Sequence, residues 1–138
     1  MVPTAVAFRS DLFPPYPGEE EEVNPGLWGK RLAEFLAEKL RTRGFASDEP
    51  FAEDWGWTVP IVNAEFPLWI GCGHQDGDAD QFLCFIEPHT PTVCKFLKTI
   101  RTEDRVAALQ AALDEVLRAE TGVKEMEWQI ADEKQNAS

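Results

Sequence analysis

The sequence lacks a long apolar run, and none of its hydrophobic stretches approaches the roughly 18 residues that span a bilayer. Its first ten residues also lack the basic start and the apolar stretch of a secretory signal. Cysteine is scarce: Cys72, Cys84 and Cys94 are the only three, and none forms a C-x-x-C pair. An odd number without that spacing is typical of reduced thiols. We therefore expect a soluble, cytoplasmic protein.

Basic residues are also few: the sequence has 13 Lys and Arg but 25 Asp and Glu, which gives a net charge of −12. A field of this sign repels nucleic acid and anionic membranes and favours a basic protein partner or a cation. With 138 residues, 43% of them hydrophobic, the chain fits a single domain, 1–138, with a sizeable core. Within it we expect a Pro/Glu-rich solvated loop at 14–26 and a polar tail at 132–138.

Motifs of nucleophilic and phosphate chemistry are missing. The sequence contains neither a G-x-S-x-G elbow nor a Gly-rich phosphate loop. We assign no catalytic residue, and this favours a non-enzymatic protein.

Two segments have the spacing of amphipathic helices. Asn24-Pro25 is a favourable helix start, and an apolar stripe follows up to Gly44. The second helix is expected from Thr102, as its cap, to Gly122. The first stripe consists of Trp28, Leu32, Phe35, Leu36 and Leu40.

Alternation of apolar and polar residues predicts strands at 4–13, 55–61, 66–72, 82–86 and 126–130. The order is strand, helix, three strands, helix, strand. Two helices with one apolar stripe each can cover one face of such a sheet. We therefore predict an α+β two-layer sandwich, with a mostly antiparallel sheet of about five strands and two helices on one face.

Potential metal ligands gather between positions 72 and 89. Thiolate, imidazole and carboxylate groups bind zinc or another divalent cation, although the spacing matches no zinc finger. The alternative is structural, because Cys72 and Cys84 fall on the apolar side of predicted strands. The candidate metal ligands are Cys72, His74, Asp76, Asp78, Asp80 and His89.

Part of this segment also resembles a calcium loop. Asp76, Asp78, Asp80 and Glu87 occupy positions 1, 3, 5 and 12 of that pattern. Gln81 stands where the pattern needs glycine, so an acidic turn is the alternative.

The motif Asp54-Trp55-Gly56-Trp57 is a candidate binding site together with Glu53. Two Trp at i and i+2 should share one face of a strand, and Trp is enriched at interface hot spots. The alternative is that both indoles pack under a helix.

A basic patch, Lys95, Lys98, Arg101 and Arg105, could bind phosphate near the second helix start or balance the acidic surface.

The segment from Trp28 to Trp128 resembles small, acidic, uncharacterised bacterial domains. The resemblance rests on the D-W-G-W motif at 54–57, on Trp69-Ile70-Gly71, and on the helix and strand from Thr102 to Ile130. Some of those domains look like immunity proteins that neutralise a basic toxin. The net charge and the lack of a catalytic motif lead us to expect a non-enzymatic acidic binding domain, monomeric or dimeric, with a basic protein partner and no cofactor, and the resemblance suggests an immunity-like role. The alternative is a small metal-binding domain or metal-dependent enzyme that uses the Cys72–His89 segment.

Overall fold

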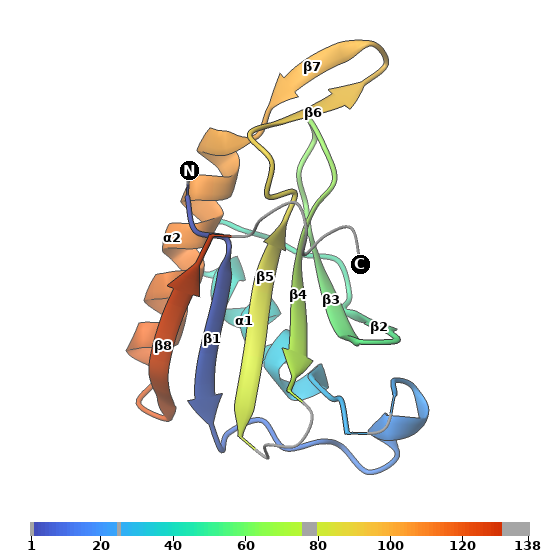
Figure 1. Cartoon of the computed structure of the whole chain (residues 1–138), viewed down its shortest axis with the longest axis vertical. Helices are drawn as coiled ribbons and strands as arrows, with labels where there is room; N and C mark the ends of the chain where they lie inside the picture. Colours follow the sequence, from blue (N-terminus) through green and yellow to red (C-terminus); the bar gives the residue numbers. More distant parts are fainter. Residues whose placement is uncertain (1, 25, 76–79, 131–138) are drawn as a thin grey trace.

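The computed structural model describes residues 2–24, 26–75 and 80–130, and Figure 1 shows its elements. Within those ranges no helix is long and apolar enough to cross a membrane. The predicted α+β architecture is confirmed, with three strands more than expected: β2, β6 and β7. In chain order the elements are β1 (Ala5–Ser10), the 3-10 helix η1 (Glu19–Glu21), α1 (Lys30–Arg41), β2 (Phe51–Glu53), β3 (Gly56–Ile61), β4 (Leu68–His74), β5 (Gln81–Glu87), β6 (Thr92–Lys95), β7 (Lys98–Arg101), α2 (Glu103–Ala119) and β8 (Val123–Gln129).

The main sheet has six antiparallel strands in the order β2-β3-β4-β5-β1-β8. The N-terminal strand β1 lies inside the sheet, where Ala5 is opposite both Phe85 of β5 and Gln129 of β8. Both outer strands discourage further pairing: β2 is only three residues long, and β8 is highly charged with an irregular register. Strands β6 and β7 form a separate hairpin.

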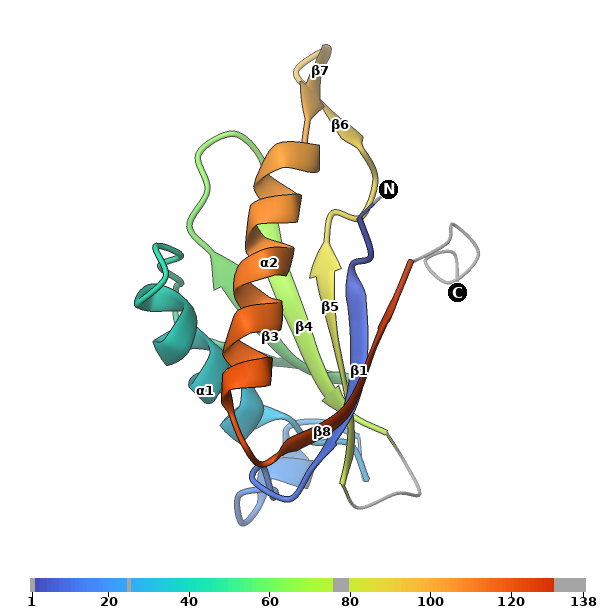
Figure 2. The same cartoon turned by 90° about the vertical axis from the view of Figure 1, so that its left-hand side faces the viewer.

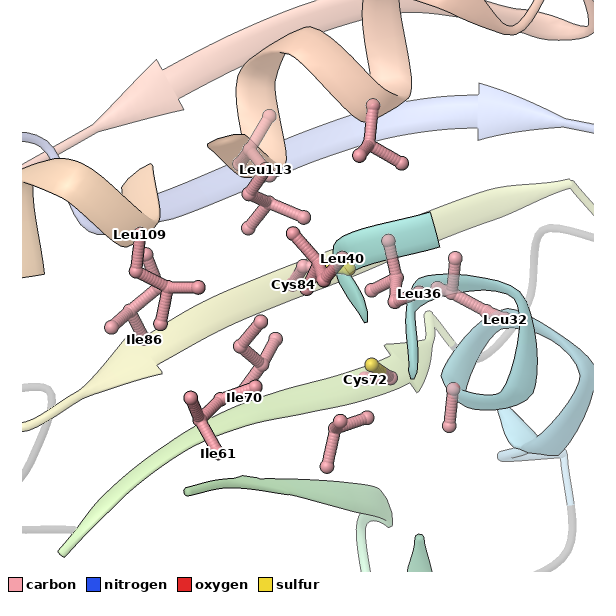
Figure 3. Packing of buried hydrophobic residues seen from close by; sticks show 14 of the residues in the cluster. Leu32, Leu36, Leu40, Ile61, Ile70, Cys72, Cys84, Ile86, Leu109 and Leu113 are labelled. Carbon is pink, nitrogen blue, oxygen red and sulfur yellow. The ribbon is translucent and has the colours of Figure 1, made fainter. Parts of the chain in front are cut away.

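Both helices pack on the same face of the sheet, as Figure 2 shows. Strand residues that alternate toward this face are buried, for example Phe82, Cys84 and Ile86 in β5. Figure 3 shows leucines of α1 and α2 above the aliphatic and cysteine side chains of β4 and β5. Removal of these apolar groups from water is the main force that stabilises the two layers. The fully buried helix residues are Leu32, Ala33, Leu36, Leu40, Leu109, Leu113 and Leu117.

Helix α1 begins at Lys30, so the prediction that it starts at Asn24-Pro25 is wrong for Asn24; Pro25 lies outside the described residues. Its N-cap is Gly29, which has no side chain to accept the first free N–H groups. The Glu19 carboxylate of η1 accepts them instead, from Gly29 N at 2.8 Å and Lys30 N at 3.0 Å. Glu19 is therefore 1% exposed, although we expected a solvated carboxylate within the 14–26 loop.

Helix α2 follows Thr102 as predicted, but the threonine side chain does not cap it. The Thr102 hydroxyl donates to the Thr90 carbonyl, and its backbone N–H donates to the Pro91 carbonyl at 3.0 Å. These bonds join the start of α2 to the segment that leads into the β6–β7 hairpin.

Candidate functional site

Two of the three cysteines form a pair in the core. Cys72 of β4 and Cys84 of β5 are opposite each other in the sheet, and both are completely buried. Figure 3 shows their sulfur atoms among aliphatic side chains. Burial raises the pKa of the Cys72 thiol well above its ordinary value, and the hydrogen bond and charge interaction with Cys84 add to this. The two cysteines therefore pack as small apolar residues of the core.

His74 also faces the helix layer and is 5% exposed. Its Nδ1 atom lies 2.8 Å from the Gly26 carbonyl, and since a carbonyl can only accept, Nδ1 donates. The imidazole stacks on the Trp28 indole with ring centroids 3.5 Å apart, and Nε2 has no hydrogen-bond partner among the described residues. These contacts hold the segment before α1 against β4, so His74 has a structural role.

The other predicted metal ligands are engaged elsewhere. The Asp80 carboxylate, directly before β5, accepts a hydrogen bond from Arg9 at 2.7 Å, whereas His89 is hydrogen-bonded to Glu87 at the other end of the strand at 3.0 Å. A seven-residue strand separates its ends by about 20 Å, so Asp80 and Glu87 cannot share a cation. Asp76 and Asp78 lie outside the described residues. Within 2–24, 26–75 and 80–130, no three His, Cys, Asp or Glu side chains are grouped for a metal ion.

The two tryptophans of the D-W-G-W motif lie on opposite faces of the sheet, so the prediction that they share one face is wrong. Trp57 is 4% exposed, opposite Cys72, with Lys30 Nζ of α1 5.3 Å from its ring. Gly56 between them has φ of 154°, where side chains are strained, and a Cβ there would lie 2.4 Å from the Cys72 carbonyl oxygen. This turn of the backbone directs Trp55 to the other face. Trp57 is thus a core residue, as the structural alternative predicts, but that alternative is wrong for Trp55, which contacts Trp69 and Phe85 on the other face.

Trp55 belongs to an aromatic cluster on the sheet face opposite the helices. Its ring centroid lies 6.0 Å from that of Trp69 in β4 and 5.2 Å from that of Phe85 in β5. Trp69 and Phe85 meet edge to face at 5.6 Å. The Phe85 ring covers Gly71, where a Cβ would lie 2.2 Å from a ring carbon. The three rings form one half-buried apolar surface on the open face of the sheet.

A concavity of about 410 Å³ adjoins this cluster on the same face. Phe51, which is 47% exposed, and Trp69 contribute apolar walls, and Glu53 contributes a carboxylate. Asp54, the next residue, is exposed as well. Glu53 therefore places a negative charge beside an apolar surface that includes Trp69 and Phe51, whereas Trp57 lies in the core.

Trp69, Phe85 and Phe51 were missed as candidates in the sequence. A signal was present, because the polar phase of the alternation in β4 and β5 contains Trp69, Leu83 and Phe85. A strand that is apolar in both phases has a second face to bury.

The predicted basic patch is divided between two places. Arg105 of α2 lies against the Phe45 ring at 4.4 Å, so it covers part of the core. Lys95, Lys98 and Arg101 belong to the β6–β7 hairpin, which extends beyond the body of the protein in Figures 1 and 2.

Comparison with known proteins returns nothing: no protein-family model, no curated protein and no solved structure matches the chain.

Proposed function

We propose that this protein is a non-enzymatic binding domain whose open sheet face binds a basic partner protein. The observation that carries the proposal is the cluster of Trp55, Trp69 and Phe85 on the face opposite the helices. Large aromatic side chains supply most of the binding energy in protein interfaces, and they are seldom left near the surface of a domain without a reason.

The charge supports the choice of partner. Glu53 lines the concavity, and Glu87 is opposite Trp69 in the sheet, so carboxylates accompany the aromatic rings. With −12 over the whole chain, the protein would attract a basic partner from a distance, and association would be fast and sensitive to salt. An immunity-like role against a basic toxin, which the resemblance suggests, is one form of this function.

The test compares two charge reversals that change net charge equally. Glu53→Lys is on the open face, whereas Glu38→Lys is on the exposed side of α1. Each protein is immobilised and exposed at low salt to extract from its native source, and bound proteins are identified by mass spectrometry. We expect the wild type and Glu38→Lys to retain the same basic protein and Glu53→Lys to lose it. Equal loss by both variants would mean that charge alone, and not this face, determines binding.

A metal-binding function of the Cys72–His89 segment is the alternative, and its support is weaker. Cys72 is buried in the core, and Asp80 and His89 lie at opposite ends of β5. Elemental analysis of untagged protein purified without chelator tests the metal-binding function. One bound equivalent of zinc would support that function.

A further inference from the structure

The tip of the β6–β7 hairpin combines exposure with backbone strain. Phe96 is 89% exposed and Leu97 is fully exposed, in contrast to the apolar residues of the core. Both have positive φ, 51° and 65°, a conformation that two-residue hairpin loops normally reserve for asparagine and glycine. Strained residues of this kind persist mainly where they serve a function. The tip therefore presents two large apolar side chains outside the core.

The hairpin also has the opposite charge to the rest of the chain. Segment 92–101 contains Lys95, Lys98 and Arg101 and no acidic residue. Because the whole chain carries −12, the remainder carries −15. A surface that suits the tip has an apolar hollow and nearby carboxylates.

The same chain carries such a surface in the concavity formed by Phe51, Trp69 and Glu53. The tip cannot reach the concavity of its own molecule, because the hairpin points away from the body (Figure 1). Pro67 and Leu68, at the start of β4, also line the concavity, and in Figures 1 and 2 β4 starts at the end of the molecule from which the hairpin extends. Tip and concavity thus lie toward one end.

We propose that a second copy of this chain occupies the concavity with its hairpin tip, and that the exchange is reciprocal. A single two-fold rotation brings each tip to the concavity of the other copy, so that two small apolar contacts with opposite charges form together. This inference rests on the proposed function, because it uses the same open face. It also adds regulation, since the dimer covers the face that binds the basic partner.

The first test is the mass of the full chain by sedimentation equilibrium over a micromolar concentration series at low salt. We expect the mass to rise from one chain to two. Phe96→Asn with Leu97→Gly introduces the residues that this turn favours, so the hairpin stays folded while the apolar tip is lost. This double variant should raise the dissociation constant at least tenfold. The matched control is Ile130→Asp, which changes another exposed apolar residue and should associate like the wild type.

Mixing two defective proteins tests the reciprocal contact. Phe51→Glu alters the concavity and leaves the tip intact, whereas the Asn-Gly variant does the reverse. Neither should dimerise alone, but their mixture should form a heterodimer through the one remaining intact contact, more weakly than the wild type.

Three results would overturn the proposal. They are a wild type that stays at the mass of one chain, an Asn-Gly variant that dimerises as well as the wild type, and a monomer whose tip binds phosphatidylserine vesicles. A monomer that still retains a basic protein through Glu53 would overturn the dimer alone. A tip-dependent dimer whose monomeric Asn-Gly variant, with its open face uncovered, also retains no basic protein would overturn the proposed function alone.

Discussion

Substitution of Glu19 tests how much its hydrogen bonds to the start of α1 stabilise the fold. Its carboxylate accepts three backbone hydrogen bonds, from Tyr16 N at 2.9 Å and from Gly29 N and Lys30 N. In Glu19→Gln, the amide oxygen can keep the two bonds to the start of α1, but the NH2 group then faces the Tyr16 N–H. Loss of one bond to a charged, buried group costs about 1.5–3 kcal/mol, and loss of the negative charge beside the helix N-terminus costs about 0.3–1 kcal/mol.

We therefore expect Glu19→Gln to lower the free energy of unfolding by about 2–4 kcal/mol, a large part of the total for a small domain. Urea unfolding followed by tryptophan fluorescence measures it, as a lower midpoint with an unchanged slope. The control is Glu21→Gln, the same chemical change at an exposed position of the same 3-10 helix, which should cost less than about 0.5 kcal/mol. Equal effects of the two variants would refute the reasoning.

Three further predictions concern Gly71, Cys72 and Tyr16. Gly71→Ala places a methyl group 2.2 Å from a carbon of the Phe85 ring on the neighbouring strand. We expect the free energy of unfolding to fall by about 1–3 kcal/mol, measured as a lower thermal midpoint. The near-ultraviolet circular dichroism of the aromatic cluster should change as well. Because the pKa of Cys72 is raised in the folded state, the Cys72 thiol loses its proton at a lower pH in the unfolded state than in the folded state. The stability that the neutral thiol contributes is therefore fully present below about pH 8.5. Above that pH the free energy of unfolding declines by up to about 1.4 kcal/mol per pH unit. Unfolding from pH 7 upward should show the decline in the wild type and in Cys94→Ala, and a shallower one in Cys72→Ala. Tyr16 is the only tyrosine, and the hydrogen bond to Glu34 raises its pKa above 10.0, so absorbance titration of the phenolate should show a lower midpoint in Glu34→Ala.

The two-layer architecture could be predicted because its signals are local. Alternation in β5 and the stripe of α2 each depend on residues a few positions apart, and both are confirmed. The start of α1 could not be predicted in this way. Its capping group is Glu19, ten positions before Gly29, and only the folded chain brings the two together.

The hairpin was missed for a different reason. Phe96 and Leu97 carry none of the usual turn chemistry, so nothing in segment 92–101 indicates a reversal of the chain. Of the candidate binding residues, Trp55 and Glu53 lie at the open face, but Trp57 does not, because Gly56 changes the direction of the backbone between the tryptophans. Trp69 could have been added from the apolar second phase of β4, whereas Phe51 could not be added without the pairing of β2 with β3.

The central place of β1 constrains the order of events during synthesis. The strand is made well before its neighbours β5 and β8, which belong to the second half of the sequence, and β8 is the last strand within the described residues. Until they leave the ribosome, Val6 and Phe8 have no partner strand and remain open to unwanted contacts. Pairing across such sequence distances is slow, so the newly made chain passes through a period when a chaperone is most useful.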